Sequence, residues 1–227
     1  MTGKIQRAIC ALMIVLSAAS LAAVPAAAEE KNDKLLVKEG FVYDPKLDAK
    51  YSNTMTVCVN EDGNLEIVKY SGWAEDVEIP ATVHGMDVVG IQENAFADIG
   101  AKTIKLPDTI EYIAANAFLN CVNLTEVVFG SNLKTVGYRL FNNCPELKSV
   151  VFPESLEKIE GRCFYNCPAL ESVYVPGTTD ASAGLAKHEQ CPNLTVITVK
   201  GSSAARVAGY DDFTVEYVEG EQSSDSK

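Results

Sequence analysis

The sequence is poor in the groups on which many enzymes and nucleic-acid-binding proteins depend. It has two histidines, His84 and His188, and one tryptophan among 227 residues. Lysine and arginine number 19 against 31 aspartate and glutamate residues, which gives a formal net charge of −12. Nucleic acids and anionic lipid head groups are bound by clusters of basic residues, so this charge argues against both as partners.

Motifs that carry chemistry are missing as well. The chain contains no Gly-x-Ser-x-Gly, no His-Glu-x-x-His and no phosphate-binding loop. Neither histidine lies near a nucleophile motif, and no pair of carboxylates stands out as general acid and base. The cysteines recur along a line, whereas zinc needs four ligands that converge on one point. We therefore predict no catalytic, cofactor-binding or metal-ligating residue.

Long apolar runs are absent except at the N-terminus. Lys4 and Arg7 precede an apolar stretch over residues 8–24, and three alanines at 26–28 form a small-residue cleavage site. This pattern is typical of a secretory signal peptide. We expect residues 1–28 to be removed, no membrane span in the remaining chain, and a secreted, extracellular or cell-surface-associated protein.

A repeat of about 23 residues fills the middle of the chain. Its columns are Cys121, Cys144, Cys167 and Cys191; Leu124, Leu147, Leu170 and Leu194; and Phe96, Phe118, Phe141 and Phe164. A fixed period between about 20 and 50 residues is the signature of a solenoid, in which stacked repeats bury a continuous core. We predict a single right-handed, β-rich solenoid of about six coils.

Each repeat contains one short strand-like segment, mostly ended by Pro or Gly. These segments are VEIP (77–80), IKLP (104–107), VVFG (127–130), VVFP (150–153), VYVP (173–176) and ITVK (197–200). Two β-type runs around Asp62-Gly63 predict a hairpin that caps the first coil. Residues 201–218 predict a short turn or helix and a final strand as the C-terminal cap. The repeat domain then covers 51–218, after an irregular lead-in at 29–50 and before a disordered acidic tail at 219–227.

The repeated phrase resembles a known family. Leu124-x-x-Val127-x-Phe129 and its equivalents are similar to the core of leucine-rich repeats. The wider phrase Ala-Phe-x-x-Cys-x-x-Leu-x-x-Val-x-x-Pro resembles the BspA-like subfamily of bacterial surface proteins, over about residues 55–218. The resemblance implies a leucine-rich-repeat solenoid that is secreted or surface-exposed, and some members of the family act in adhesion to host or bacterial partners.

Alternation along the strands predicts which side chains face outward. With Val127 and Phe129 inward, the outward row is Glu78, Lys105, Val128, Val151, Tyr174 and Thr198, flanked by Asp76, Thr103, Glu126, Ser149, Ser172 and Val196. The candidate partner-binding residues are Lys105, Val128, Val151, Tyr174 and Thr198. Contiguous exposed apolar residues mark interfaces, and tyrosine is a frequent anchor. Simple β-propensity on an exposed strand explains the same pattern without a function.

The cysteines leave two alternatives open. Six remain after signal removal, and an even number in a secreted chain favours disulfides. Four of them occupy one column of small core residues, which favours unpaired thiols that pack as small hydrophobes. Neighbouring coils lie about 4.8 Å apart, a spacing that also permits a disulfide.

Taken together, these patterns predict a secreted, non-enzymatic leucine-rich repeat protein. It would bind a protein or a glycan at a bacterial or host cell surface. The alternative is a structural component of the cell envelope without a dedicated ligand, and a more remote one is a small secreted hydrolase. Neither a cofactor nor an oligomeric state follows from the sequence.

Overall fold

The computed structural model describes residues 41–42, 55–83 and 85–219. The expected signal peptide at 1–28, His84 and residues 220–227 of the expected tail lie outside the described part. So does the lead-in at 29–50, apart from Phe41–Val42. These two residues form strand β1, which pairs antiparallel with β2, so the lead-in is regular at this point.

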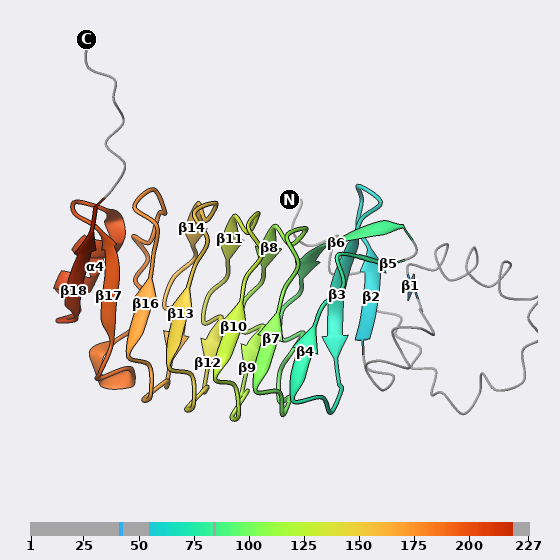
Figure 1. Cartoon of the computed structure of the whole chain (residues 1–227), viewed down its shortest axis with the longest axis horizontal. Coiled ribbons are helices and arrows are strands. Elements are labelled where there is room, and N and C mark those ends of the chain that lie inside the picture. The colour runs from blue at the N-terminus through green and yellow to red at the C-terminus, as the bar shows by residue number, and fades with distance from the viewer. Residues whose placement is uncertain (1–40, 43–54, 84, 220–227) are drawn as a thin grey trace, which may run out of the picture.

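The coils stack along one axis as a solenoid (Figure 1). One face, here called the strand face, carries the strands β4 (Asp76–Glu78), β7 (Thr103–Lys105), β10 (Glu126–Val128), β13 (Ser149–Val151), β16 (Ser172–Tyr174), β17 (Thr195–Val199) and β18 (Thr214–Val218). These strands mark about seven turns, one more than the sequence predicted, because β18 adds a further strand to the stack. The predicted leucine-rich-repeat solenoid is confirmed.

Two further ladders close each coil. One contains β6 (Met86–Ile91), β8 (Tyr112–Ile113), β11 (Thr135–Val136) and β14 (Lys158–Ile159). The other contains β9 (Phe118–Leu119), β12 (Phe141–Asn142) and β15 (Phe164–Tyr165). All these pairs are parallel and in register, with Phe141 opposite Phe164. The step of 22 or 23 residues in these ladders thus places equivalent side chains directly above one another.

The predicted hairpin is present at the N-terminal end. Strands β2 (Met55–Val59) and β3 (Leu65–Tyr70) pair antiparallel. The side-chain oxygen of Asn60 accepts hydrogen bonds from the backbone of Asp62 and Asn64, and Gly63 supplies the positive φ of the turn. Strand β3 pairs with β6, which joins the hairpin to the first coil; the short strand β5 (Thr82–Val83) pairs with β6 from the other side.

A column of aromatic rings runs through the core. Phe96, Phe118, Phe141 and Phe164 are buried, and successive ring centroids lie 5.6, 5.3 and 5.4 Å apart. Burial of such a side chain contributes about 1.5–3 kcal/mol, and stacked aromatic pairs add to that. This column is the main apolar contact between neighbouring coils.

At the coil corners the backbone adopts left-handed φ angles, which the repeat pattern in the sequence did not predict. Positive φ angles recur in two columns, namely Asn94, Asn116, Arg139 and Arg162, and Asp98, Asn120, Asn143 and Asn166. In the second column the Asn120 amide donates to Asp98, Asn143 to Asn120 and Asn166 to Asn143, over 3.0, 2.9 and 2.7 Å. Asparagine tolerates this backbone better than most residues, and its amide bonds from coil to coil.

The cysteine column lies inside the solenoid. Cys121, Cys144, Cys163, Cys167 and Cys191 are buried and free, which confirms the interpretation as core thiols for these five. The Cys121 thiol donates to the Phe96 carbonyl and the Cys144 thiol to the Phe118 carbonyl, both over 3.1 Å. Burial raises the pKa of the Cys163 thiol well above its ordinary value.

The C-terminal end departs from the repeat as predicted. Residues 178–190 lack the phenylalanine and contain the short 3-10 helix η3 (His188–Gln190). Helix α4 (Ser203–Tyr210) follows β17, and the Ser202 hydroxyl caps it by accepting from the Ala205 amide. Strand β18 then pairs parallel with β17.

Candidate interaction surface on the strand face

The strand face presents one inward residue between two outward ones in most coils. The burial pattern of β4, β10 and β13 is exposed, buried, exposed. Register places Lys105 opposite Val128 and Val151 opposite Tyr174. Val128 is 44% exposed and Val151 65%, while Tyr174 is half-buried. The predicted outward placement of these four candidates is confirmed.

The predicted outward placement of Thr198 is wrong. Thr198 is fully buried, and its hydroxyl lies 3.0 Å from that of Ser202 at the start of α4. Ile197, not Thr198, stands opposite Tyr174. Val173 follows Leu170 by three positions, but Val196 follows Leu194 by only two. A shift of one residue reverses the faces of a strand, so Ile197 turns outward and Thr198 inward.

The same shift corrects the flanking row. Val196 is buried, and Thr195 stands opposite Ser172 in its place. The outward apolar row therefore consists of Val128, Val151, Tyr174 and Ile197, hereafter the apolar row. The sequence did contain a signal that Ile197 faces outward. Leu194 and Val196 are both buried and only two positions apart, and this spacing sets the inward and outward positions of β17, whereas the distance between the cysteines does not.

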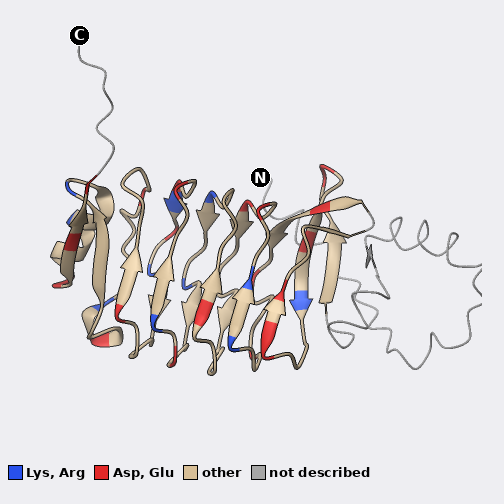
Figure 2. Cartoon of the chain, viewed as in Figure 1, with Lys and Arg blue, Asp and Glu red and all other residues tan. Residues whose placement is uncertain are grey.

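The two halves of the strand face differ in charge. On the N-terminal half, Lys102 pairs with Glu75 over 2.8 Å and Lys105 with Glu78 over 3.2 Å. The hydrogen bond to Glu75 raises the pKa of Lys102. Figure 2 shows acidic segments on β4 and β10, whereas β13, β16 and β17 contain no charged residue. The apolar row thus begins where the ion pairs end.

The strand ladder is interrupted inside the apolar row. Strand β10 pairs with β7 and β13 pairs with β16, but no backbone hydrogen bond among the described residues joins β10 to β13. The two coils stay in contact through the Phe129 and Phe152 rings, whose centroids lie 5.3 Å apart. Val128 and Val151 lie on either side of this interruption.

Tyr174 is held in place by a carboxylate. Its hydroxyl donates a hydrogen bond to Glu154, in the turn that follows β13. This bond raises the pKa of Tyr174 to about 12. The ring therefore has a defined orientation before any partner arrives, which reduces the side-chain entropy that binding would cost.

The strand face combines apolar side chains with hydroxyl groups, a composition suited to contacts with a partner. Among the described residues, no cluster of three or more His, Cys, Asp or Glu side chains is placed to hold a metal ion. Serine and threonine hydroxyls at Ser149, Ser172 and Thr195 line the apolar row. Apolar side chains flanked by hydrogen-bonding groups are the usual composition of a protein interface.

The repeat matches a family model. The model of the BspA type leucine-rich repeat region matches residues 74–205 in six copies. The chain belongs to the BspA-type leucine-rich repeat family. A comparison with curated proteins gave no match. In the described part of this BspA-type chain, no helix is both long enough and apolar enough to cross a membrane.

Several crystal structures share the fold. A leucine-rich cell surface protein of Faecalibacterium prausnitzii is 23% identical with a TM-score of 0.57; the match covers 72% of this chain and 42% of that protein. A leucine-rich repeat protein of Bacteroides capillosus is 25% identical with a TM-score of 0.53, over 60% of this chain and 97% of that one. One from T. pallidum is 21% identical with a TM-score of 0.50, over 74% and 98%. The chain thus spans less than half of the F. prausnitzii protein.

Proposed function

We propose that this chain is a non-enzymatic interaction module, located outside the cell or at its surface, that binds a protein partner through the apolar row. The observation that carries this proposal is the exposure of Val128 and Val151 on adjacent strands, next to Tyr174 and Ile197. Contiguous exposed apolar side chains on an otherwise charged surface mark sites of interaction.

A protein partner fits this surface better than a neutral glycan. Aliphatic methyl groups bury well against other apolar side chains, and Tyr174 supplies an oriented aromatic ring. The hydroxyls of Ser149, Ser172 and Thr195 provide hydrogen bonds beside that apolar centre. The surface location rests on the expected signal peptide and on the likeness to the F. prausnitzii cell surface protein.

The test is a crosslinking capture with the full chain against bacterial envelope extracts and host matrix proteins. Val151→Asp places a charge at the centre of the apolar row. Val122→Asp is the matched control, because Val122 is 46% exposed and lies outside the strands of the strand face. We expect a captured protein to bind Val151→Asp at least about tenfold more weakly than wild type, the effect of losing one interface hot spot.

Two outcomes would contradict the proposal. Equal loss in Val151→Asp and Val122→Asp would mean that added charge, not the apolar row, weakens binding. No capture by wild type from either source would favour a structural component of the cell envelope without a dedicated ligand. Circular dichroism of both variants checks that each keeps the solenoid fold.

A further inference from the structure

Some cations of the solenoid form no ion pair among the described residues. The ion pairs of the described residues use Lys102, Lys105 and Lys134. Arg139, Arg162 and Lys187 take part in none of them. Arg139 lies between β11 and β12, and Arg162 between β14 and β15, at a coil corner away from the strand face. Arg162 and Lys187 line one hollow together with a single carboxylate, Asp211, so cations outnumber acids at this place in a chain of net charge −12.

The two arginines occupy strained backbone. Their φ angles are 51° and 38°, in the column where the two preceding coils have Asn94 and Asn116. Arginine is less favourable than asparagine in this conformation, so the change does not serve the fold. Strained residues are retained where the side chain itself has a use.

The Arg139 guanidinium is sandwiched by aromatic rings. Its central carbon lies 4.3 Å from the ring centre of Tyr165 and 5.0 Å from that of Tyr138. Its Nε is buried and finds no hydrogen-bond partner among the described residues. The two rings thus hold the guanidinium in one orientation at this corner.

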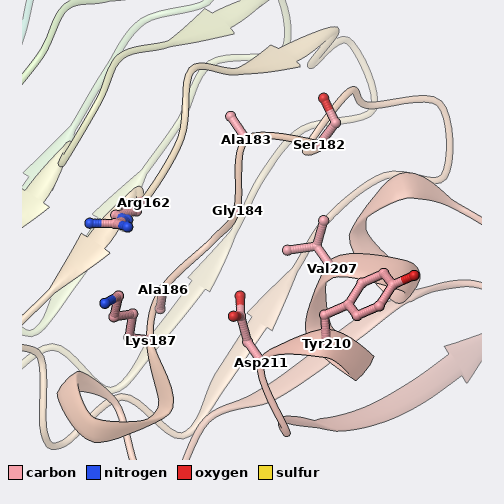
Figure 3. Close-up of a pocket in the computed structure, with 9 residues that line it drawn as sticks. All are labelled: Arg162, Ser182, Ala183, Gly184, Ala186, Lys187, Val207, Tyr210 and Asp211. Atoms are coloured by element: carbon pink, nitrogen blue, oxygen red, sulfur yellow. The ribbon is translucent and has the colours of Figure 1, made fainter.

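A hollow of about 270 Å³, lined in part by Arg162, lies one coil further along the solenoid than Arg139. The Arg139 amide donates to the Gly161 carbonyl and the Arg162 amide to the Gly184 carbonyl, so these residues follow one another coil by coil. Figure 3 shows Arg162 and Lys187 on one side of the hollow, Tyr210 on the other, and Asp211 between them. Tyr210 is 88% exposed.

We propose that this hollow, lined by Arg162, Lys187, Tyr210 and Asp211, is a second binding site, for the carboxylate-bearing sugars of an acidic glycan. Arg162 and Lys187 hold the carboxylate, because guanidinium and ammonium groups donate charge-assisted hydrogen bonds to it. Tyr210 offers an exposed ring face to the apolar C–H face of the sugar. The Asp211 carboxylate accepts hydrogen bonds from sugar hydroxyls.

The size of the hollow and the exposed ring favour a sugar acid over an acidic peptide. Pockets for small molecules measure about 300–1,000 Å³, so this hollow takes a single ring rather than a peptide segment. An acidic peptide would gain little from the exposed ring of Tyr210.

The test is titration calorimetry of the full chain with two acidic sugars, trigalacturonic acid and sialyllactose. Their neutral counterparts, the methyl esters of both, keep the rings and remove the charge. We expect at least one acid to bind at least tenfold more tightly than its neutral counterpart. Arg162→Asn should remove that binding, and Tyr210→Ser should weaken it.

The controls separate this site from the fold and from the strand face. Arg162→Asn restores the residue type of Asn94 and Asn116, so its thermal unfolding temperature should equal or exceed that of wild type. Lys148→Gln removes an exposed cation elsewhere, and Val151→Asp alters the apolar row; both should bind the acid normally. The proposal is overturned if neither acid binds, if Arg162→Asn binds as wild type, or if poly-glutamate binds as tightly as the sugars.

Discussion

The N-terminal and C-terminal halves of the strand face share a backbone and differ in what they present. In β4 and β7 the outward positions hold Glu78 and Lys105, which neutralise each other. In β13 and β16 the same positions hold Val151 and Tyr174. The central inward residues are aliphatic from β4 to β17, namely Val77, Ile104, Val127, Val150, Val173 and Val196. Burial therefore limits the inward positions of every coil, while the outward ones are free to differ, and differences among them are where function is to be sought.

The largest expected effect tests whether the core is equivalent in both halves. Phe118→Ala and Phe164→Ala each remove one ring of the buried column, one from each half. Each should lower the free energy of unfolding by about 3–5 kcal/mol, the cost of a lost core aromatic and of the cavity that remains. Chemical denaturation followed by circular dichroism measures both. A difference above about 2 kcal/mol between them would show that the halves are not equivalent inside.

A smaller effect tests the register of β17. Thr198→Val removes the buried hydroxyl that meets Ser202 and should destabilise the protein by about 1 kcal/mol. Val151→Thr, the reverse change at an exposed outward position, should stay within about 0.5 kcal/mol of wild type. The same denaturation experiment applies. If Thr198→Val were neutral and Ile197→Thr costly, the outward row would follow the cysteine spacing after all.

The smallest effect concerns the orientation of Tyr174. Because its hydrogen bond to Glu154 raises its pKa to about 12, the phenol should still be protonated well above pH 10. The folded pKa exceeds the unfolded one, so this contribution to stability is complete below pH 10 and is lost as the pH rises toward 12. Difference absorbance of wild type against Tyr174→Phe isolates this phenol. Glu154→Gln should return its pKa toward the ordinary value, and an unchanged titration would contradict the contact.

The sequence predicted the parts of the fold that repeat. Columns of Cys, Leu and Phe revealed the period, and alternation placed Val128, Val151 and Tyr174 outward. Asp62-Gly63 located the N-terminal hairpin, and the alanine-rich segment after Gly201 located α4. Each of these rests on a local pattern that is read within one repeat or by comparison of equivalent positions.

The errors and omissions arose where the repeat changes. Thr198 was aligned by its distance from Cys191. The segment that contains the 3-10 helix η3 places one additional residue before Cys191, and β17 begins one residue closer to Cys191 than the equivalent strand does in the preceding coil. The corner with Arg139 and Arg162 was missed because positive φ angles leave little trace in a residue pattern once asparagine is replaced.

The sequence by itself determined the period, the buried columns, the acidic charge and the family, because burial of one residue type at a fixed spacing is a property of the chain. Only the tertiary structure decided which neighbours meet across coils. The interruption between β10 and β13, the bond from Tyr174 to Glu154 and the grouping of Arg162 with Lys187 and Tyr210 join residues about 20 to 50 positions apart. Their distances depend on how each coil closes and stacks, which the spacing of residues along the chain does not specify.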